Sequence, residues 1–232
     1  MSKTRILAAI LATFSITSSL RAVTVPYTED FAAGNANWLD FSNNSFLTPV
    51  ASGGPDDSSY ASGTRNFNAT ADGSTLVIFR ANSTTPPPVF APASGGAFVG
   101  NWIAADAVRL SAYVRHNAPV PVSYFARISD VPSPGMIFAD SNVVQPNTWT
   151  PISFWISPNN PTIQGEGVPF DQVLDNIGRV QIGAISSSAL SAINQAFTFD
   201  IDQVHLTTPE PTSLVTAGVA AFAGCFIRCR SR

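Results

Sequence analysis

Short stretches of alternating apolar and polar residues recur through the middle of the chain. Every second residue is apolar in segments 108–115, 122–128, 152–156 and 180–184, which is the pattern of a half-buried β-strand. Segment 76–79 is continuously apolar and predicts a strand buried on both faces. Segments rich in Gly, Pro, Ser and Asp separate these stretches. The pattern predicts an all-β fold, an antiparallel two-sheet sandwich of the jelly-roll kind.

The last predicted strand changes phase along its length. Its apolar residues alternate as far as Ile201 and resume one position out of step at Val204. One extra residue in a strand flips every side chain after it, so we expect a β-bulge near Asp202 and Gln203. A single short helix is predicted at 170–176, and segment 157–168 is predicted to be a loop.

Composition narrows the ways in which the central segment 23–208 can be stabilised and what it can bind. Both cysteines, Cys225 and Cys229, lie near the C-terminus, so this segment has no disulfide available and depends on its core packing. It holds six arginines, no lysine and fourteen acids, a formal charge of −8. Because nucleic-acid binding depends on neutralising phosphates, this acidic segment argues against a nucleic-acid partner.

Residues 1–22 have the layout of a secretory signal peptide. Lys3 and Arg5 precede an apolar run at 6–16, and small residues lead up to Ala22. The apolar run is too short for a comfortable membrane span. We therefore expect cleavage after Ala22 and export of the segment that follows.

Residues 209–232 form a second terminal segment with three parts. Two prolines come first and are expected to end the preceding strand, leaving an extended, accessible peptide. The mostly apolar stretch 214–227 would reach roughly 21 Å as a helix, short of the ~30 Å hydrocarbon core. A basic end follows, which the positive-inside rule keeps in the cytoplasm. The segment therefore predicts a transient anchor in the inner membrane, with a plain single-pass anchor as the other interpretation.

The order of these three parts resembles the PEP-CTERM sorting signal of exported bacterial proteins. The resemblance covers about 24 of the 232 residues. It implies that a membrane protease of the exosortase type cuts near the motif and that the body reaches the cell surface or the extracellular matrix. The residues that carry it are Pro209, Glu210, Pro211, Arg228 and Arg230.

The two ends of the central segment resemble, at the level of pattern, the edges of carbohydrate-binding-module-type jelly rolls. Segment 28–31 with Trp38 and the closing segment 199–206 carry this resemblance. First and last strands are often adjacent in those folds, which implies that Glu29 or Asp30 lies near Asp200 or Asp202. Carboxylate oxygens suit Ca²⁺. A structural calcium site is therefore one interpretation of these four acids, and ordinary solvent-facing carboxylates are the other.

The alternation also predicts which side chains point outward from the sheets. Aromatic rings beside guanidinium groups on a sheet face can stack on sugar rings and bind their hydroxyls. The other interpretation is that loops cover these side chains and form a second core with them. The candidate ligand-binding residues are Tyr113, Arg115, Phe125, Arg127 and Trp155.

Signals for catalysis are weak. Neither His116 nor His205 lies in a nucleophile-elbow motif or a histidine metal pair, and fourteen acids offer no way to choose one catalytic pair. We therefore expect a non-enzymatic protein of the cell envelope or extracellular matrix. A carbohydrate-binding module for exopolysaccharide or environmental glycans is the alternative, and a glycoside hydrolase is the third possibility.

Overall fold

The computed structural model describes residues 23–130 and 134–210, which fold into two packed antiparallel sheets. Sheet A contains β1 (Tyr27–Glu29), β2 (Thr48–Val50), β3 (Tyr60–Asn66), β5 (Arg109–His116), β8 (Thr150–Trp155) and β11 (Ala196–Thr207). Sheet B contains β4 (Thr75–Asn82), β6 (Val122–Ser129), β7 (Gly135–Val144), β9 (Ile163–Gly165) and β10 (Arg179–Ile185). The all-β prediction is confirmed, and each strand expected from the alternation is present.

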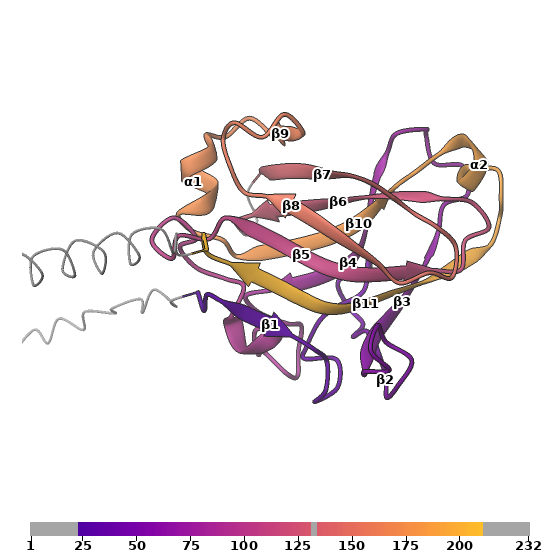
Figure 1. Ribbon diagram of the computed structural model, residues 1–232, viewed down its shortest axis with the longest axis horizontal. Coiled ribbons are helices and arrows are strands. Elements are labelled where there is room, and N and C mark those ends of the chain that lie inside the picture. The colour runs from indigo at the N-terminus through magenta and orange to yellow at the C-terminus, as the bar shows by residue number, and fades with distance from the viewer. Residues whose placement is uncertain (1–22, 131–133, 211–232) are drawn as a thin grey trace, which may run out of the picture.

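The strand order is that of a jelly roll. Sheet A runs β2-β3-β11-β5-β8, with β1 also on β11, and sheet B runs β4-β10-β6-β7-β9. The chain therefore crosses from one sheet to the other at most connections, and sheet A lies in front of sheet B in Figure 1. The first and last strands are adjacent as expected, with Tyr27 opposite Leu206. Both ends of the described chain consequently leave the sandwich on the same side (Figure 1).

One hydrophobic core fills the space between the sheets, because the inward residues of each strand meet there. Leu110, Ala112 and Val114 of β5 are buried, and Val180, Ile182 and Ala184 of β10 face them from the other sheet. Several large rings are fully buried in the same core: Trp38, Trp102, Phe79, Phe138, Phe154 and Phe199.

Register shifts in the strand pairings adjust which side chains reach this core. The pairing of β11 with β5 shifts between Asp202 and His205, and Gln203 takes a positive φ of 46°, so the bulge predicted there is confirmed. A second shift lies in the pairing of β10 with β4 and leaves Ile78 as the extra residue. Ile78 and Phe79 are therefore both buried. The strand at 76–79 was predicted to be buried on both faces, but Val77 is only half-buried. The continuous apolar run reflects the bulge instead, because the extra residue lets the consecutive residues Ile78 and Phe79 both be buried.

The short helix predicted at 170–176 is present as α1 (Phe170–Leu174). A second helix, α2 (Ser188–Ser191), was not predicted, and the side chain of Ser187 caps it by accepting a hydrogen bond from the Leu190 amide at 3.3 Å. A 3₁₀ segment, η1 (Ala93–Gly96), lies beside β4. The expectation of a loop throughout 157–168 was wrong, because β9 pairs there with β7 at the edge of sheet B.

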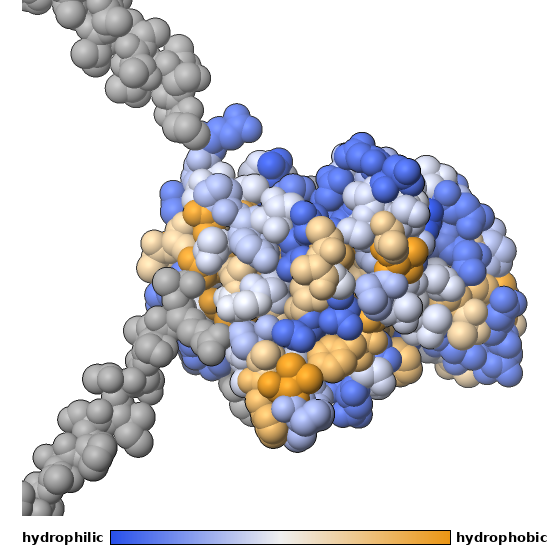
Figure 2. All heavy atoms as spheres, turned by 90° about the horizontal axis from the view of Figure 1, so that it is seen from below, coloured by the Kyte–Doolittle hydropathy of each residue, from blue (hydrophilic) through white to orange (hydrophobic). Residues whose placement is uncertain are grey.

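The side of the molecule that carries β1 and β2 is a mixture of hydrophilic surface and separate hydrophobic patches (Figure 2). Exposed large apolar side chains are spread over several loops and strands, including Phe41, Phe46, Phe90 and Ile103. No helix in the described part of the chain is long and apolar enough to cross a membrane.

Gly183 on β10 gives a direct test of the packing of sheet B. A Cβ at this position would lie 2.3 Å from the Leu76 carbonyl oxygen and 2.7 Å from the Phe125 ring. Gly183→Ala is therefore expected to destabilise the protein by about 1–3 kcal/mol, as overpacked sites do. Urea denaturation of the full chain measures this loss.

Gly165→Ala on β9 is the matched control for this substitution. Its Cβ would meet the flexible Met136 thioether at 3.3 Å, which can move aside. Equal denaturation midpoints for the two variants would contradict the packing described at Gly183.

Candidate functional site

The outer face of sheet A carries two parallel rows of side chains on the neighbouring strands β5 and β8. Alternate residues of each strand point outward, and the two rows are joined in antiparallel register. The ends of the β5 row, Arg109 and Arg115, are six positions apart in the sequence, so the rows extend over roughly 20 Å. The facing pairs are Arg109 with Trp155, Ser111 with Ser153, and Tyr113 with Pro151, and Trp149 continues the β8 row next to Arg115.

One end of these rows is built around Arg115. Its guanidinium lies 4.7 Å from the centre of the Trp149 ring and 5.0 Å from that of Tyr60. It also forms an ion pair of 2.8 Å with Asp200 and donates a 2.9 Å hydrogen bond to the Tyr60 hydroxyl. The Trp149 indole N–H donates to the Gly53 carbonyl at 2.8 Å. These contacts hold both rings in place, and Asp200 balances the charge of Arg115.

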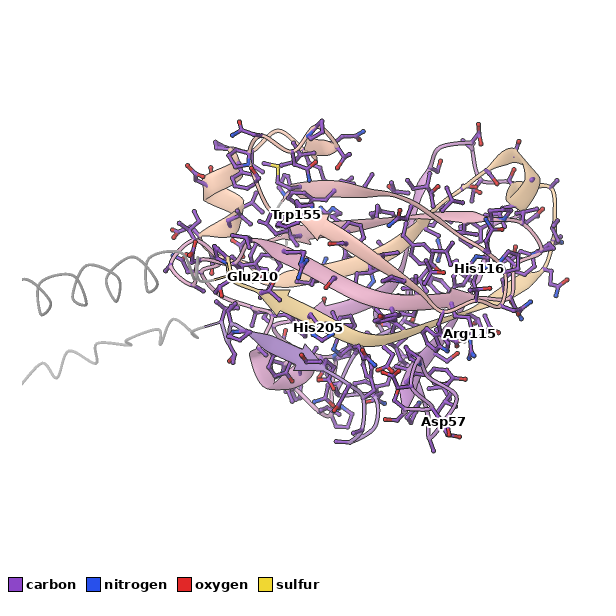
Figure 3. All side chains as sticks on the ribbon, viewed as in Figure 1. Asp57, Arg115, His116, Trp155, His205 and Glu210 are labelled. Carbon is purple, nitrogen blue, oxygen red and sulfur yellow. The ribbon has the colours of Figure 1, made fainter. Side chains whose placement is uncertain are left out.

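The other end is open and carries Arg109 and Trp155. The Arg109 guanidinium lies 5.4 Å from the centre of the Trp155 ring, and Trp155 is 57% exposed. Arg109 forms no ion pair with any described residue. Both side chains border a pocket of about 560 Å³ whose other walls include Ile156, Thr207 and Glu210. Figure 3 shows Trp155 and Glu210 toward one end of the sandwich and Arg115 toward the other.

Uncharged polar groups lie between these two ends. His205 on β11 is opposite Ser111 in the register, and its Nδ1 lies 2.7 Å from the Thr28 hydroxyl. Burial, together with the charge of Arg109, lowers the pKa of His205, so its ring is neutral near pH 7. The face therefore combines aromatic surfaces at its ends with hydroxyl and imidazole hydrogen-bonding groups at its centre. Such a surface can stack on the apolar faces of sugar rings and bind their hydroxyls.

The five residues predicted to bind a ligand divide between two faces. Tyr113, Arg115 and Trp155 lie on the outer face of sheet A. Phe125 and Arg127 belong to β6 and lie on sheet B, where Phe125 is 1% exposed and its ring would touch a Cβ added to Gly183. The structure thus brings three of the five together.

Tyr60 and Trp149 are site residues that the sequence reasoning did not find. Trp149 could have been found, because it has the same parity as Pro151, Ser153 and Trp155 and needs only an extension of that strand. Tyr60 comes from β3, which carries no clear alternation, and no sequence signal pointed to it.

The four acids predicted to hold calcium are bonded to protein groups. Glu29 accepts from the Phe31 amide at 3.0 Å, and Asp30 accepts from the amide two residues further on at the same distance. Asp200 pairs with Arg115, while Asp202 accepts from the Ser58 hydroxyl at 2.6 Å. Burial raises the pKa of Asp202. Over residues 23–130 and 134–210, no three His, Cys, Asp or Glu side chains are grouped to hold a metal ion, and calcium binding stays a prediction.

His116 lies in the core of the sandwich. It is 1% exposed, its Nε2 lies 3.1 Å from the Val144 carbonyl oxygen, and its ring packs against Phe199. Burial lowers its pKa, so the ring is neutral at pH 7. These contacts indicate that His116 has a structural role in the core.

Only the start of the predicted sorting motif lies in the described chain. Pro209 and Glu210 follow the end of β11 and are exposed. Pro211, Arg228 and Arg230, the predicted apolar helix and the predicted signal peptide at 1–22 lie outside the described residues.

No protein family model matches this chain, and no curated protein matches it. Among solved structures, it is similar to the CBM22-1 and GH10 modules of endo-1,4-β-D-xylanase 10B from Clostridium thermocellum, in complex with xylohexaose, at 14% identity and a TM-score of 0.49. That match covers 79% of this chain and 28% of that one. An exo-β-agarase matches at 10% identity and a TM-score of 0.49, over 81% of this chain and 26% of that one.

A third similar structure is the family 11 carbohydrate-binding module from Clostridium thermocellum in complex with a β-1,3-1,4-mixed-linked tetrasaccharide. Its identity is 12% and its TM-score 0.46, over 81% of this chain and 98% of that one. The chain thus spans less than a third of the xylanase and agarase chains, and nearly all of this module. These identities and TM-scores carry no family, ligand or activity over to this chain.

Proposed function

We propose that this protein is a non-enzymatic glycan-binding domain of the bacterial cell surface or extracellular matrix. The observation that carries the proposal is the outer face of β5 and β8, where an Arg–Trp stack stands at each end of a polar middle. A polysaccharide lying along these strands would stack on both tryptophans and bind the hydroxyls between them. Because the chain is predicted to reach the cell surface or the extracellular matrix, we infer that its partner is an exopolysaccharide of the cell's own surface.

The two ends of the face have different roles in this proposal. The Trp149 ring is held by Gly53 and Arg115, so little freedom is lost when a sugar stacks there. Trp155 stands exposed beside a pocket of about 560 Å³, which is within the size range of small-molecule sites. We assign the main sugar subsite to Trp155 and a second, preorganised subsite to Trp149.

Removing the ring of Trp155 tests this assignment. Trp155→Ala is expected to weaken binding of the native exopolysaccharide about tenfold, because an aromatic contact of ~1.4 kcal/mol is lost. Adding Trp149→Ala should weaken binding further. Affinity electrophoresis of the full chain through gels containing the polysaccharide measures both effects, and circular dichroism checks that the variants fold.

Phe90→Ala is the matched control, since Phe90 is an aromatic residue 67% exposed outside this face. Its binding should equal that of the unmodified protein. Unchanged retention of the Trp155→Ala and Trp149→Ala double variant would overturn the glycan-binding role.

We further propose that the chain is exported, held briefly in the inner membrane by its C-terminal segment and cut near the Pro-Glu-Pro motif by an exosortase-type protease. Residues 1–22 and 209–232 carry the sequence pattern for these steps. The exposure of Pro209 and Glu210 beyond the end of β11 supports access of a protease to the motif.

Intact-mass analysis of the protein recovered from the native cell surface tests the processing. The expected mass is that of a chain beginning after Ala22 and ending near Pro209. A mass that still includes the basic end with Arg228 and Arg230 would show that the C-terminal segment is retained, contrary to the proposal. Replacing Pro209 and Pro211 by Ala is expected to reduce the cut form.

A further inference from the structure

The outer face of sheet B, opposite the proposed glycan face, carries three arginines on three adjacent strands. Arg80 of β4, Gln181 of β10 and Arg127 of β6 lie side by side in the register. Two residues along, Asn82, Arg179 and Ser129 form the next row in the same register. Neighbouring strands are ~4.8 Å apart, so the three guanidinium groups share one small area of surface.

The uncharged residues of these rows orient the arginines without neutralising them. Arg127 donates to the Gln181 side-chain oxygen at 2.9 Å, and Arg179 donates through Nε to the Asn82 side-chain oxygen at 3.1 Å. Gln181 is 2% exposed and Asn82 is 4% exposed. Buried amides of this kind hold the guanidinium groups in fixed positions.

Positive charge exceeds negative charge in this cluster. Glu166 pairs with Arg127 through two hydrogen bonds of 2.6 Å. Arg80 and Arg179 form no ion pair with a described residue, and the Arg80 Nε is buried without a partner. Arg80 donates instead to the Phe41 carbonyl at 3.2 Å.

Burial and the neighbouring positive charges both lower the pKa values of Arg80 and Arg179. Burial lowers the pKa of Arg80 to about 10, and the charges of Arg179, Arg127 and Arg65 add to the effect, while Asp40 offsets part of it. Burial and the charge of Arg127 also lower the pKa of Arg179. The central segment as a whole carries six arginines against fourteen acids. Half of those arginines lie in this cluster, and Glu166 pairs with one of them. The cluster is therefore a positively charged area on an acidic domain.

A polar pocket of about 210 Å³ lies directly beside this cluster. Its volume corresponds to roughly seven waters at ~30 Å³ each, which is enough for one sulfate, phosphate or carboxylate group. Its walls are mostly hydrogen-bonding side chains, together with Pro86 and one cation. They include Asn43, Asn82, Ser83, Thr84, Thr85 and Arg179.

We propose that this pocket on sheet B binds an oxyanion, with Arg179 as its anchor. The planar guanidinium matches two oxygens of a carboxylate, sulfate or phosphate, and the hydroxyl and amide groups of the walls can donate to the others. Arg80 and Arg127 add to the favourable potential. The bound group is either a free inorganic anion or the acidic substituent of a polysaccharide. This site lies on the sheet opposite Trp155 and does not depend on the proposed glycan face.

Calorimetric titration of the full chain with sodium sulfate, sodium phosphate and polygalacturonate, each against sodium chloride of equal ionic strength, tests the site. We expect saturable binding of at least one probe, weakened at least tenfold by Arg179→Gln and reduced by Arg80→Gln. For sulfate and phosphate, which offer no sugar ring to the opposite sheet, Arg109→Gln is the charge-matched control and should bind as the unmodified protein does. Trp155→Ala should also leave sulfate and phosphate binding unchanged, which separates this site from the proposed glycan face.

The probes distinguish the source of the anion. This comparison uses the Trp155→Ala and Trp149→Ala double variant, which lacks the proposed sugar-stacking rings. Tighter binding of polygalacturonate than of the inorganic ions then assigns the site to an acidic glycan, and the reverse order assigns it to a free anion. If Arg179→Gln does not fold, Arg179→Lys, which keeps the charge and loses the planar fork, should still bind less tightly. No saturable binding of any probe, or binding that the Arg179 and Arg80 variants retain in full, overturns the proposal.

Discussion

The pairing of β11 with its neighbours is the constraint on which the rest of the sandwich depends. This strand lies against β5 on one side and against β3 and then β1 on the other, so it joins both ends of the described chain to the middle of sheet A. The bulge after Asp202 restores the inward direction of Val204 and Leu206. Without that extra residue the two halves of the strand could not both bury their apolar side chains. The outward direction of Asp200, which balances Arg115, follows from the same register.

Alternation along the chain was sufficient to predict the strands that form the two sheet centres, because each buries one face. It also located the bulge in β11, since a change of phase between Ile201 and Val204 has one simple structural cause. The short strands β1, β2 and β9 have three residues each, too few for a periodic signal. Alternation predicts that a side chain points outward, but it does not predict which sheet the strand belongs to. Phe125 and Arg127 of sheet B were therefore predicted to share a face with residues that lie on sheet A. The arginine cluster on sheet B had no sequence signal, because its members are brought together by strand register alone.

The two outer faces place similar residue types in different electrostatic settings. On sheet A, Arg115 is neutralised by Asp200 and stacked against rings, so that end presents aromatic surface with little net charge. On sheet B, Arg179 has amide and hydroxyl neighbours and forms no ion pair with a described residue. A neutral sugar ring suits the first arrangement and an anionic group suits the second, so an acidic polysaccharide would present a suitable group to each face.

The adjacency of β1 and β11 also decides how the domain would carry mechanical load. Because Tyr27 is opposite Leu206, the chain enters and leaves at the same end of the sandwich (Figure 1). A pull between the two chain ends would peel β1 from β11 one hydrogen bond at a time, at low force. A pull from the C-terminal end, with the outer face of β5 and β8 held by a ligand, runs along the length of β11 instead. Its hydrogen bonds to β5 and β3 would then be loaded in shear and share the force, so the domain resists most strongly when it is tethered at its C-terminal end and bound along that face.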